Sequence, residues 1–153
     1  MMPVPGDSGI RMSTRHDAPC DPAGVRFELF VDDVETTIRF YRANLGLRPP
    51  EKYDPDGYVA LHAGAVTIGV SRATNLEPDH YFSPERLSAQ RGVGVEIVIE
   101  VDDVDRYYAL ATSWAARHGG DVEPVADQPW GLRDFRIIDP DGYYVRVTSP
   151  SQR

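Results

Sequence analysis

The sequence predicts an α+β fold built from two βαβββ units. The main observation is a repeat: the string VDDV occurs at Val31 and again at Val101. Each copy follows an alternating apolar run, which is typical of a strand, and precedes an apolar stripe of helical spacing. An internal repeat of this kind indicates two copies of one supersecondary unit, and therefore a shared architecture for both halves of the chain.

The first unit starts with a strand at residues 26–31 whose side chains alternate between two faces. Phe27, Leu29 and Val31 lie on the face towards the helices, and the other residues lie on the opposite face. Asp33 suits a helix N-cap, because its carboxylate accepts free amide hydrogens of the first turn. Gly46 follows the helical stripe, where a left-handed residue often ends a helix. The stripe consists of Val34, Ile38, Tyr41 and Leu45.

Three further strands are expected in the first unit, at residues 48–53, 58–62 and 66–71. The first of them should be an edge strand, because its two prolines have no amide hydrogen for a ladder. A turn at residues 54–57 separates it from the next strand, since proline and glycine supply the required dihedral angles. Residues 84–90 favour a short helix within the segment that connects the units.

The second unit repeats this order. A strand at residues 95–101 leads into a helix at 103–118, and a strand at 121–124 follows. The strands at 133–138 and 144–148 flank a DPDG turn and form a predicted hairpin. The string DPDGY also occurs at residues 54–58, but the two copies are not equivalent in the repeat. We interpret them as shared turn chemistry and not as a repeated site.

These patterns divide the chain into four segments. Residues 1–24 are proline-rich without an apolar core, which predicts a disordered tail and no signal peptide. Residues 25–72 form the first unit, and residues 92–149 the second. The connecting arm at 73–91 is long, and long connections are usually functional or exchanged between units or protomers.

The composition of the chain argues against several classes of function. The net charge of −8 argues against nucleic-acid binding, which needs cations to neutralise phosphates, and mildly favours cationic or neutral ligands. No apolar run has the length of a membrane span, so no membrane partner is expected. The single cysteine, Cys20, excludes an intrachain disulfide and fits a cytoplasmic protein.

Three motifs carry a family resemblance: VDDVETTIRFYRANLGL, GVEIVIEVDDVDRYYAL and PWGLRDFRIIDPDGYYVRV. With these motifs the chain resembles the vicinal oxygen chelate superfamily, also called the glyoxalase/bleomycin resistance/dioxygenase family. The resemblance covers about residues 25–149. It implies paired βαβββ units whose curved mixed sheets form a cup and, in many members, homodimers with exchanged or shared units. The family includes enzymes as well as drug-binding proteins, so the fold alone does not give the function.

The resemblance also identifies the four positions that hold a metal in metal-dependent members. They correspond to Arg26, to Gly69 or Ser71, to Glu96, and to Arg146. Arginine offers only hydrogen-bond donors and cannot bind a cation, whereas a metal needs several oxygen or nitrogen ligands. We therefore expect no metal and no cofactor, and interpret the chain as a member of the bleomycin-resistance-like, drug-binding branch.

In place of a metal, Arg26, Glu96 and Arg146 are predicted to form a charged network that recognises polar ligand groups. The alternative is that they are ordinary polar residues on the wet face of a sheet. Aromatic side chains on the cup strands and rims suit planar ligands, although each one also fits core packing. His80, Tyr81 and Phe82 in the arm add rim candidates. The predicted ligand contacts are Arg26, Glu28, Phe30, Tyr53, Tyr58, Glu96, Trp130, Tyr144 and Arg146.

The leading hypothesis is a noncatalytic homodimer that sequesters a small aromatic or cationic compound and so confers antibiotic resistance. A second hypothesis is a metal-dependent glyoxalase- or dioxygenase-like enzyme with other ligands, namely Glu28, Glu96, Glu100 and His62. A third is metal-free acid–base catalysis by Glu96 or Glu100. Metal analysis and recovery of unchanged ligand separate these hypotheses.

Overall fold

The chain forms two mixed sheets that share one helical layer. The structure is a computed structural model and describes residues 22–151, so Cys20 and nearly all of the predicted tail lie outside it. The first sheet has the order β1-β3-β2 and the second the order β4-β7-β6-β5. The strands are β1 (Phe27–Val31), β2 (Val59–Ala63), β3 (Val66–Arg72), β4 (Glu96–Glu100), β5 (Ala126–Asp127), β6 (Arg133–Ile138) and β7 (Tyr144–Thr148).

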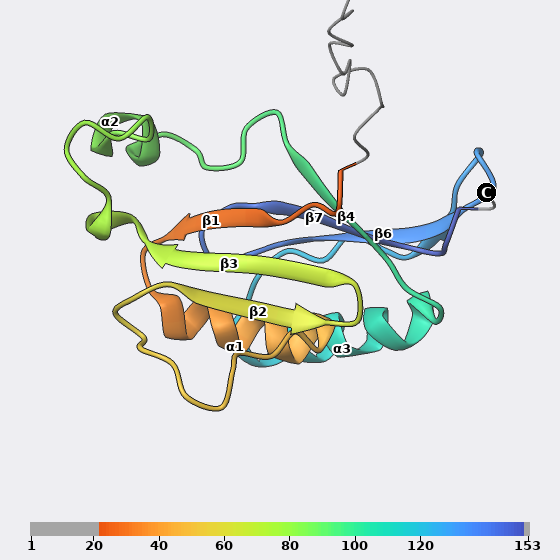
Figure 1. Ribbon diagram of the computed structural model, residues 1–153. Helices are drawn as coiled ribbons and strands as arrows, with labels where there is room; N and C mark the ends of the chain where they lie inside the picture. The colour runs from red at the N-terminus through yellow and green to blue at the C-terminus, as the bar shows by residue number, and fades with distance from the viewer. Residues whose placement is uncertain (1–21, 152–153) are drawn as a thin grey trace, which may run out of the picture.

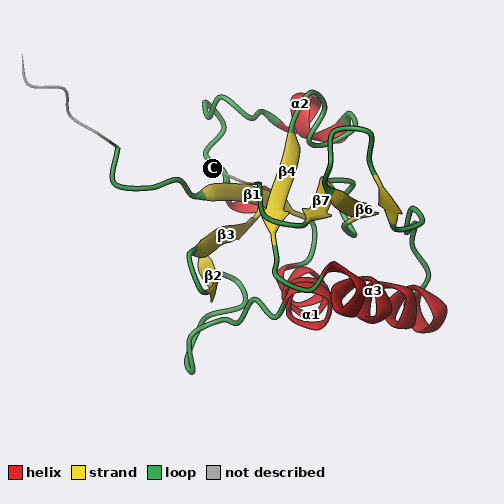
Figure 2. Ribbon diagram, turned by 90° about the vertical axis from the view of Figure 1, so that its right-hand side faces the viewer, coloured by secondary structure: helices red, strands yellow, loops and turns green. Residues whose placement is uncertain are grey.

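The helices separate a covered face of the sheets from an open face. Helices α1 (Val34–Leu45) and α3 (Val104–His118) pack against each other on one side of the sheets (Figure 1). The connecting arm carries a 3₁₀ turn, Ala73–Asn75, and helix α2 (Pro84–Ser88), and it lies on the opposite side (Figure 2). The predicted α+β class and the short helix in the arm are confirmed.

The two halves of the chain share the same strand pairing and the same type of helix cap. In each half the first strand pairs in parallel with the last, β1 with β3 and β4 with β7. Asp33 Oδ1 accepts a hydrogen bond from Thr36 N at 2.7 Å, and Asp103 Oδ1 accepts one from Arg106 N at 3.0 Å. Both helices are thus fixed at the point where they leave a strand, as the VDDV strings predict.

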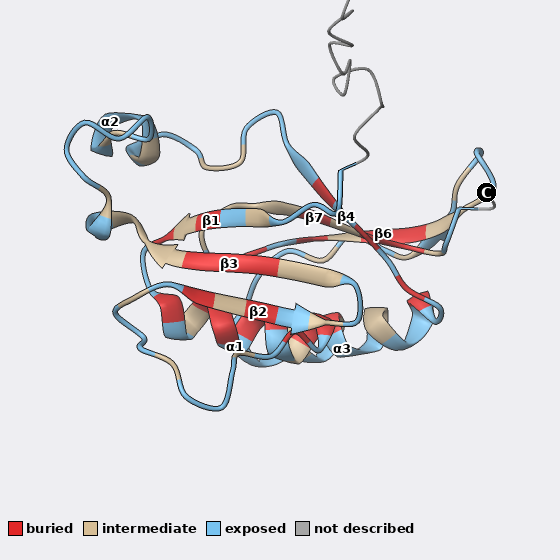
Figure 3. Cartoon of the chain, in the orientation of Figure 1, coloured by how far each residue is buried: buried red, intermediate tan, exposed pale blue. Residues whose placement is uncertain are grey.

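The core lies between the helical layer and the two sheets, as the buried segments in Figure 3 show. Alternate residues of β4 are buried and exposed, so one face of this strand packs on α3 and the other is open. Gly46 ends α1 with a φ of 69°, which a side chain rarely adopts, and this confirms the predicted stop. The sequence therefore places the open faces correctly.

Two predicted strands are wrong in extent. In the segment 48–53 only Arg48 pairs, in an isolated bridge with His62. Pro49 and Pro50 follow it and cannot donate to a ladder, so the pairing stops there. In the second half Val122 forms an isolated bridge with Ile137, and the regular pairing occurs later, at β5. Among the described residues, no helix has the length and apolar character needed to cross a membrane.

Candidate functional site

An apolar cavity lies between β1, the connecting arm and the start of β4. It has a volume of about 380 Å³, and we call it the arm pocket. Glu28 and Phe30, two of the predicted ligand contacts, belong to its wall. Leu87 from α2 and Val95 before β4 contribute further apolar surface. Ligand cavities in proteins are commonly of this size and mostly apolar, with a few polar groups.

Aromatic rings from the arm cover Phe30. The ring centroid of Phe30 lies 5.3 Å from that of Phe82 and 5.6 Å from that of His80. Tyr81 contacts Phe82 edge-on at 5.2 Å. His80 also accepts a hydrogen bond at Nδ1 from the backbone amide of Phe82, at 3.1 Å. These contacts hold the arm over β1, and the sequence anticipated the aromatic residues involved.

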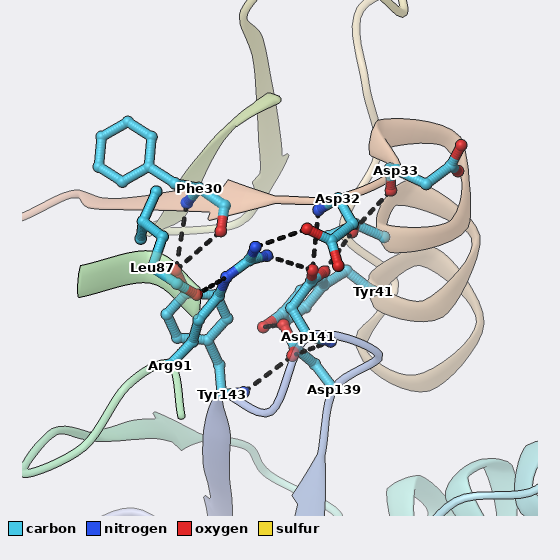
Figure 4. A network of polar contacts seen from close by, with 10 residues as sticks. Phe30, Asp32, Asp33, Tyr41, Leu87, Arg91, Asp139, Asp141 and Tyr143 are labelled. Atoms are coloured by element: carbon cyan, nitrogen blue, oxygen red, sulfur yellow. Dashed lines mark hydrogen bonds and ion pairs between the residues drawn. The ribbon is translucent and has the colours of Figure 1, made fainter. Parts of the chain in front are cut away.

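Arg91 fixes the other end of the arm (Figure 4). Its guanidinium pairs with Asp32 and with Asp141, both at 2.5 Å, and its side chain is only 10% exposed. Asp32 follows β1 whereas Asp141 lies in the turn between β6 and β7, so Arg91 joins the two halves and the arm. An arginine that binds two carboxylates at once is strongly oriented, because its planar donors match theirs.

The turn that carries Asp141 is itself part of the junction between the halves. The hydroxyl of Tyr143 accepts from Phe30 N at 3.2 Å and donates to Phe30 O at 3.0 Å. The hydroxyl of Tyr41 in α1 donates to Asp139 Oδ2 at 2.9 Å. Burial raises the pKa of Asp139 to about 6, although hydrogen bonds from Tyr143, Tyr41 and Asp141 oppose that rise. Burial also raises the pKa of Asp141.

On the first sheet, Glu28 is the centre of a local polar group. Its carboxylate lies 2.5 Å from the Arg26 guanidinium and accepts from the Tyr58 hydroxyl at 3.1 Å. Burial raises the pKa of Tyr58, and the hydrogen bond to Glu28 adds to the rise. A side chain at Gly69 would collide with both Glu28 and Tyr58, so the glycine leaves the space that this pair occupies.

On the second sheet, Glu96 lies between two arginines. Its carboxylate is 3.4 Å from Arg136 Nε and 3.7 Å from Arg146 Nε. Arg136 and Arg146 are direct partners across β6 and β7, an arrangement that costs free energy unless a carboxylate intervenes. Arg136 also pairs with the buried Asp134 at 3.1 Å. The sequence analysis missed Arg136, although it alternates with apolar residues along β6 and this pattern places it on the open face.

The predicted contacts therefore divide into separate groups. Arg26 pairs with Glu28 and not with the Glu96–Arg146 pair, which lies on the other sheet. Tyr144 is on the same face as Glu96, and its hydroxyl donates to Glu123 at 2.7 Å. Tyr53 lies on the helical side, where its hydroxyl donates to Glu35 of α1 at 3.0 Å. Trp130 is exposed in the loop between β5 and β6 and does not line the arm pocket.

Comparison with known proteins identifies the family. The family model for the glyoxalase/bleomycin resistance protein/dioxygenase superfamily matches residues 17–147. The chain belongs to this superfamily. The resemblance drawn from the three motifs is thereby confirmed. Comparison with curated proteins gives no match.

Solved structures that share this fold include TioX, a bleomycin-binding protein and a lyase. TioX from Micromonospora sp. ML1 is 21% identical over 86% of this chain and 98% of its own, with a TM-score of 0.59. A bleomycin-binding protein solved with bleomycin is 19% identical over 86% and 100%, with a TM-score of 0.55. Lactoylglutathione lyase from Agrobacterium tumefaciens is 20% identical over 84% and 94%, with a TM-score of 0.56. At these identities the likeness concerns the fold.

The residues at the positions where the resemblance implies metal ligands, namely Arg26, Gly69 or Ser71, Glu96 and Arg146, do not fit a divalent ion. Arg26 and Arg146 offer only donors, and Glu28 fills the space beside Gly69. Glu96 is the remaining carboxylate, and both of its oxygens face guanidinium groups. Within residues 22–151, no three His, Cys, Asp or Glu side chains are grouped in a way that would hold a metal. At these positions Arg26 and Arg146 instead form ion pairs with Glu28 and Glu96.

Proposed function

We propose that the protein binds a small planar aromatic compound in the arm pocket and sequesters it without chemical change, as a resistance protein does. The observation that carries this proposal is the apolar cavity under the arm, where Phe30, Phe82 and Tyr81 offer aromatic surface. Flat rings bind such surfaces by stacking and edge contacts. The paired charges of Arg26, Glu28 and Glu96 support binding over metal-dependent chemistry, because both carboxylates already face guanidinium groups.

The proposal extends to a cytoplasmic homodimer. The open side carries large apolar side chains that are well exposed, which is unusual for the surface of an isolated subunit. These residues are Tyr58, Tyr81, Val93, Val95 and Val98. A second copy that covers them would enclose the ligand, with Tyr144, Arg146 and Glu96 in its surroundings. Sedimentation velocity tests this assembly, and a monomer at all concentrations would contradict it.

Calorimetry tests the binding function. The full-length protein is titrated with bleomycin and with planar aromatic antibiotics, and the bound compound is then recovered and weighed by mass spectrometry. We expect saturable binding and recovery of unchanged compound. A modified product, together with metal in proportion to protein, would favour the glyoxalase- or dioxygenase-like alternative. A modified product without metal would favour acid–base catalysis by Glu96 or Glu100.

Two aromatic variants locate the ligand. Phe82→Ala removes a ring from the pocket wall, and we expect it to weaken binding about tenfold, the equivalent of one good aromatic contact of about 1.4 kcal/mol. Trp130→Ala is the matched control, since Trp130 is more exposed and lies outside the pocket. Equal losses in both variants, or a loss in Trp130→Ala alone, would move the proposed site away from the arm.

A further inference from the structure

The charged side chains in the wall of the arm pocket are Glu28, Arg86 and Arg91. Two of them already have counter-charges. Glu28 faces the Arg26 guanidinium at 2.5 Å, and Arg91 faces Asp32 and Asp141 at the same distance. The Glu28–Arg26 pair is neutral, whereas the Arg91 group has one net negative charge, because two carboxylates face one guanidinium. Neither of these two carboxylates lines the pocket, and Asp32 is 81% exposed, so solvent screens much of its field. Arg86 is therefore the charged side chain of the wall that has no carboxylate partner.

Arg86 is held in place by the arm itself. Its NH1 group donates to the backbone oxygen of Tyr81 at 3.1 Å, and its guanidinium carbon lies 4.4 Å from the centre of the Tyr81 ring. Ser83 caps the helix that carries Arg86, and Pro84 begins it. Stacking on an aromatic face orients a guanidinium without consuming its donors. Arg86 thus keeps donors available at the edge of the pocket.

No carboxylate within residues 22–151 forms an ion pair with Arg86; its contacts are the Tyr81 backbone oxygen and ring. An oriented arginine without a counter-ion, next to aromatic surface, matches a flat ligand that bears a carboxylate or a similar oxyanion. Arginine donors bind such groups in pairs, with charge-assisted hydrogen bonds. Arg86 therefore favours an anionic group at this edge of the pocket, although the net charge of the protein is −8.

We infer that Arg86 makes the arm pocket selective for planar aromatic compounds that carry an anionic group. This inference rests on the proposed binding function and adds the chemical class of the ligand. The aromatic part lies against Phe30 and Phe82, and the anion lies against the guanidinium of Arg86. A cationic ligand of the same shape is rejected, because it meets an uncompensated positive charge.

A matched set of naphthalene compounds tests this selectivity. The probes are 2-naphthoate, 2-naphthamide and 2-naphthylmethylammonium, which share one ring system and differ in charge. Binding to the full-length protein is followed by amide chemical shifts in NMR, which also locate the site through Phe82, Arg86 and Val95. We expect 2-naphthoate to bind about tenfold more tightly than the amide, as a partly exposed charge-assisted bond provides. We expect the ammonium compound to bind most weakly.

Variants of Arg86 assign the preference to this side chain. In Arg86→Gln the naphthoate and the amide should bind equally, whereas Arg86→Lys should keep part of the preference because it keeps the charge. Arg106→Gln is the matched control, since Arg106 is an exposed arginine on α3, on the other side of the sheets. It should leave the ratio unchanged.

The outcomes separate this inference from the function on which it rests. If the naphthoate and the amide bind the wild-type pocket equally, or if the ammonium compound binds best, the inference is wrong while an aromatic binding site stands. If the preference persists in Arg86→Gln, another residue sets it and the inference is wrong. If none of the three probes shifts the pocket amides, both the inference and the proposed function are contradicted.

Discussion

The string DPDGY occurs in two turns that are alike locally and differ in their surroundings. In the first turn Asp56 N donates to Asp54 Oδ1 at 3.0 Å, and in the second Asp141 N donates to Asp139 Oδ1 at 2.9 Å. In both, the glycine amide donates to the backbone oxygen of the first aspartate at 3.0 Å. These bonds need only neighbouring residues, so five residues are enough to determine the turn.

Tertiary placement gives the two turns different roles. The first lies at the surface, where Asp56 pairs with Arg72 and both are substantially exposed. The second is inserted between the halves of the chain, and its Asp139 is only 4% exposed. The corresponding pair there is Asp141 with Arg91, which is largely buried. The comparison shows that a short motif determines a backbone conformation, whereas its contribution to stability depends on the residues that bury it.

The largest difference is expected at the first aspartate. Asp139→Ala leaves the buried Tyr41 hydroxyl and two backbone amides without an acceptor, which costs about 3 kcal/mol of unfolding free energy. Asp54→Ala affects an exposed turn and should cost less than about 1 kcal/mol. Urea unfolding below about pH 4 measures both, because Asp139 is then protonated in the folded and the unfolded chain and its ionisation does not enter the comparison. Equal losses of unfolding free energy would mean that the two turns contribute equally to stability, which would contradict this comparison.

The next largest difference in unfolding free energy is expected between Arg91 and Arg72, the arginines that pair with the two turns. Arg91→Gln leaves the buried Asp141 carboxylate without its cation, and we expect a loss of about 2–3 kcal/mol at pH 7. Arg72→Gln breaks an exposed pair and should cost between about 0 and 1 kcal/mol. Since Arg91 also anchors the arm, its variant should weaken ligand binding, whereas Arg72→Gln should not. A stable Arg91→Gln protein with unchanged binding would contradict the anchoring role.

The pH dependence sharpens the comparison at Asp139. Its pKa is about 6 in the folded protein and about 4 in an unfolded chain, so the folded state holds the proton more tightly. The contribution of this carboxyl to stability is therefore greatest below about pH 4 and falls as pH rises towards 6, by about 2–3 kcal/mol. Asp139→Asn has no such dependence. Measured by urea unfolding, the stability of this variant relative to wild type should rise between pH 4 and 7.

Local features explain what the sequence predicted correctly. The Asp33 cap, the Gly46 stop and the alternating strands each depend on residues a few positions apart, and all three are present in the structure. The edge strand at 48–53 was wrong because Pro49 and Pro50 stop the pairing directly after Arg48, so no strand forms even at the sheet edge. The repeat gave the order of the elements, because both halves use the same local signals.

The candidate site was predicted only in part, because its assembly depends on distant contacts. Nothing in the local pattern shows that Tyr143 reaches Phe30, a separation of 113 residues, or that Arg91 joins two turns. Tyr53 looked equivalent to Tyr58, yet the chain between α1 and β2 carries Tyr53 to the helical side. Residue type was enough to identify the aromatic and charged candidates. The residues that they contact are determined by the fold and could not be predicted from the local sequence.

The tyrosines that end the two strings provide the smallest and most local test. Tyr143→Phe keeps the ring that packs beside Gly92 and removes only the hydroxyl that satisfies Phe30 N and Phe30 O. The loss should be about 1 kcal/mol, against less than about 0.5 kcal/mol for Tyr58→Phe, whose hydroxyl meets the exposed Glu28. Hydrogen exchange at the Phe30 amide should accelerate in Tyr143→Phe alone, because this amide donates its hydrogen bond to the Tyr143 hydroxyl. Unchanged exchange at the Phe30 amide would show that the Tyr143 hydroxyl does not protect the junction between the halves. Burial of the Tyr143 ring alone would then distinguish the second turn from the first.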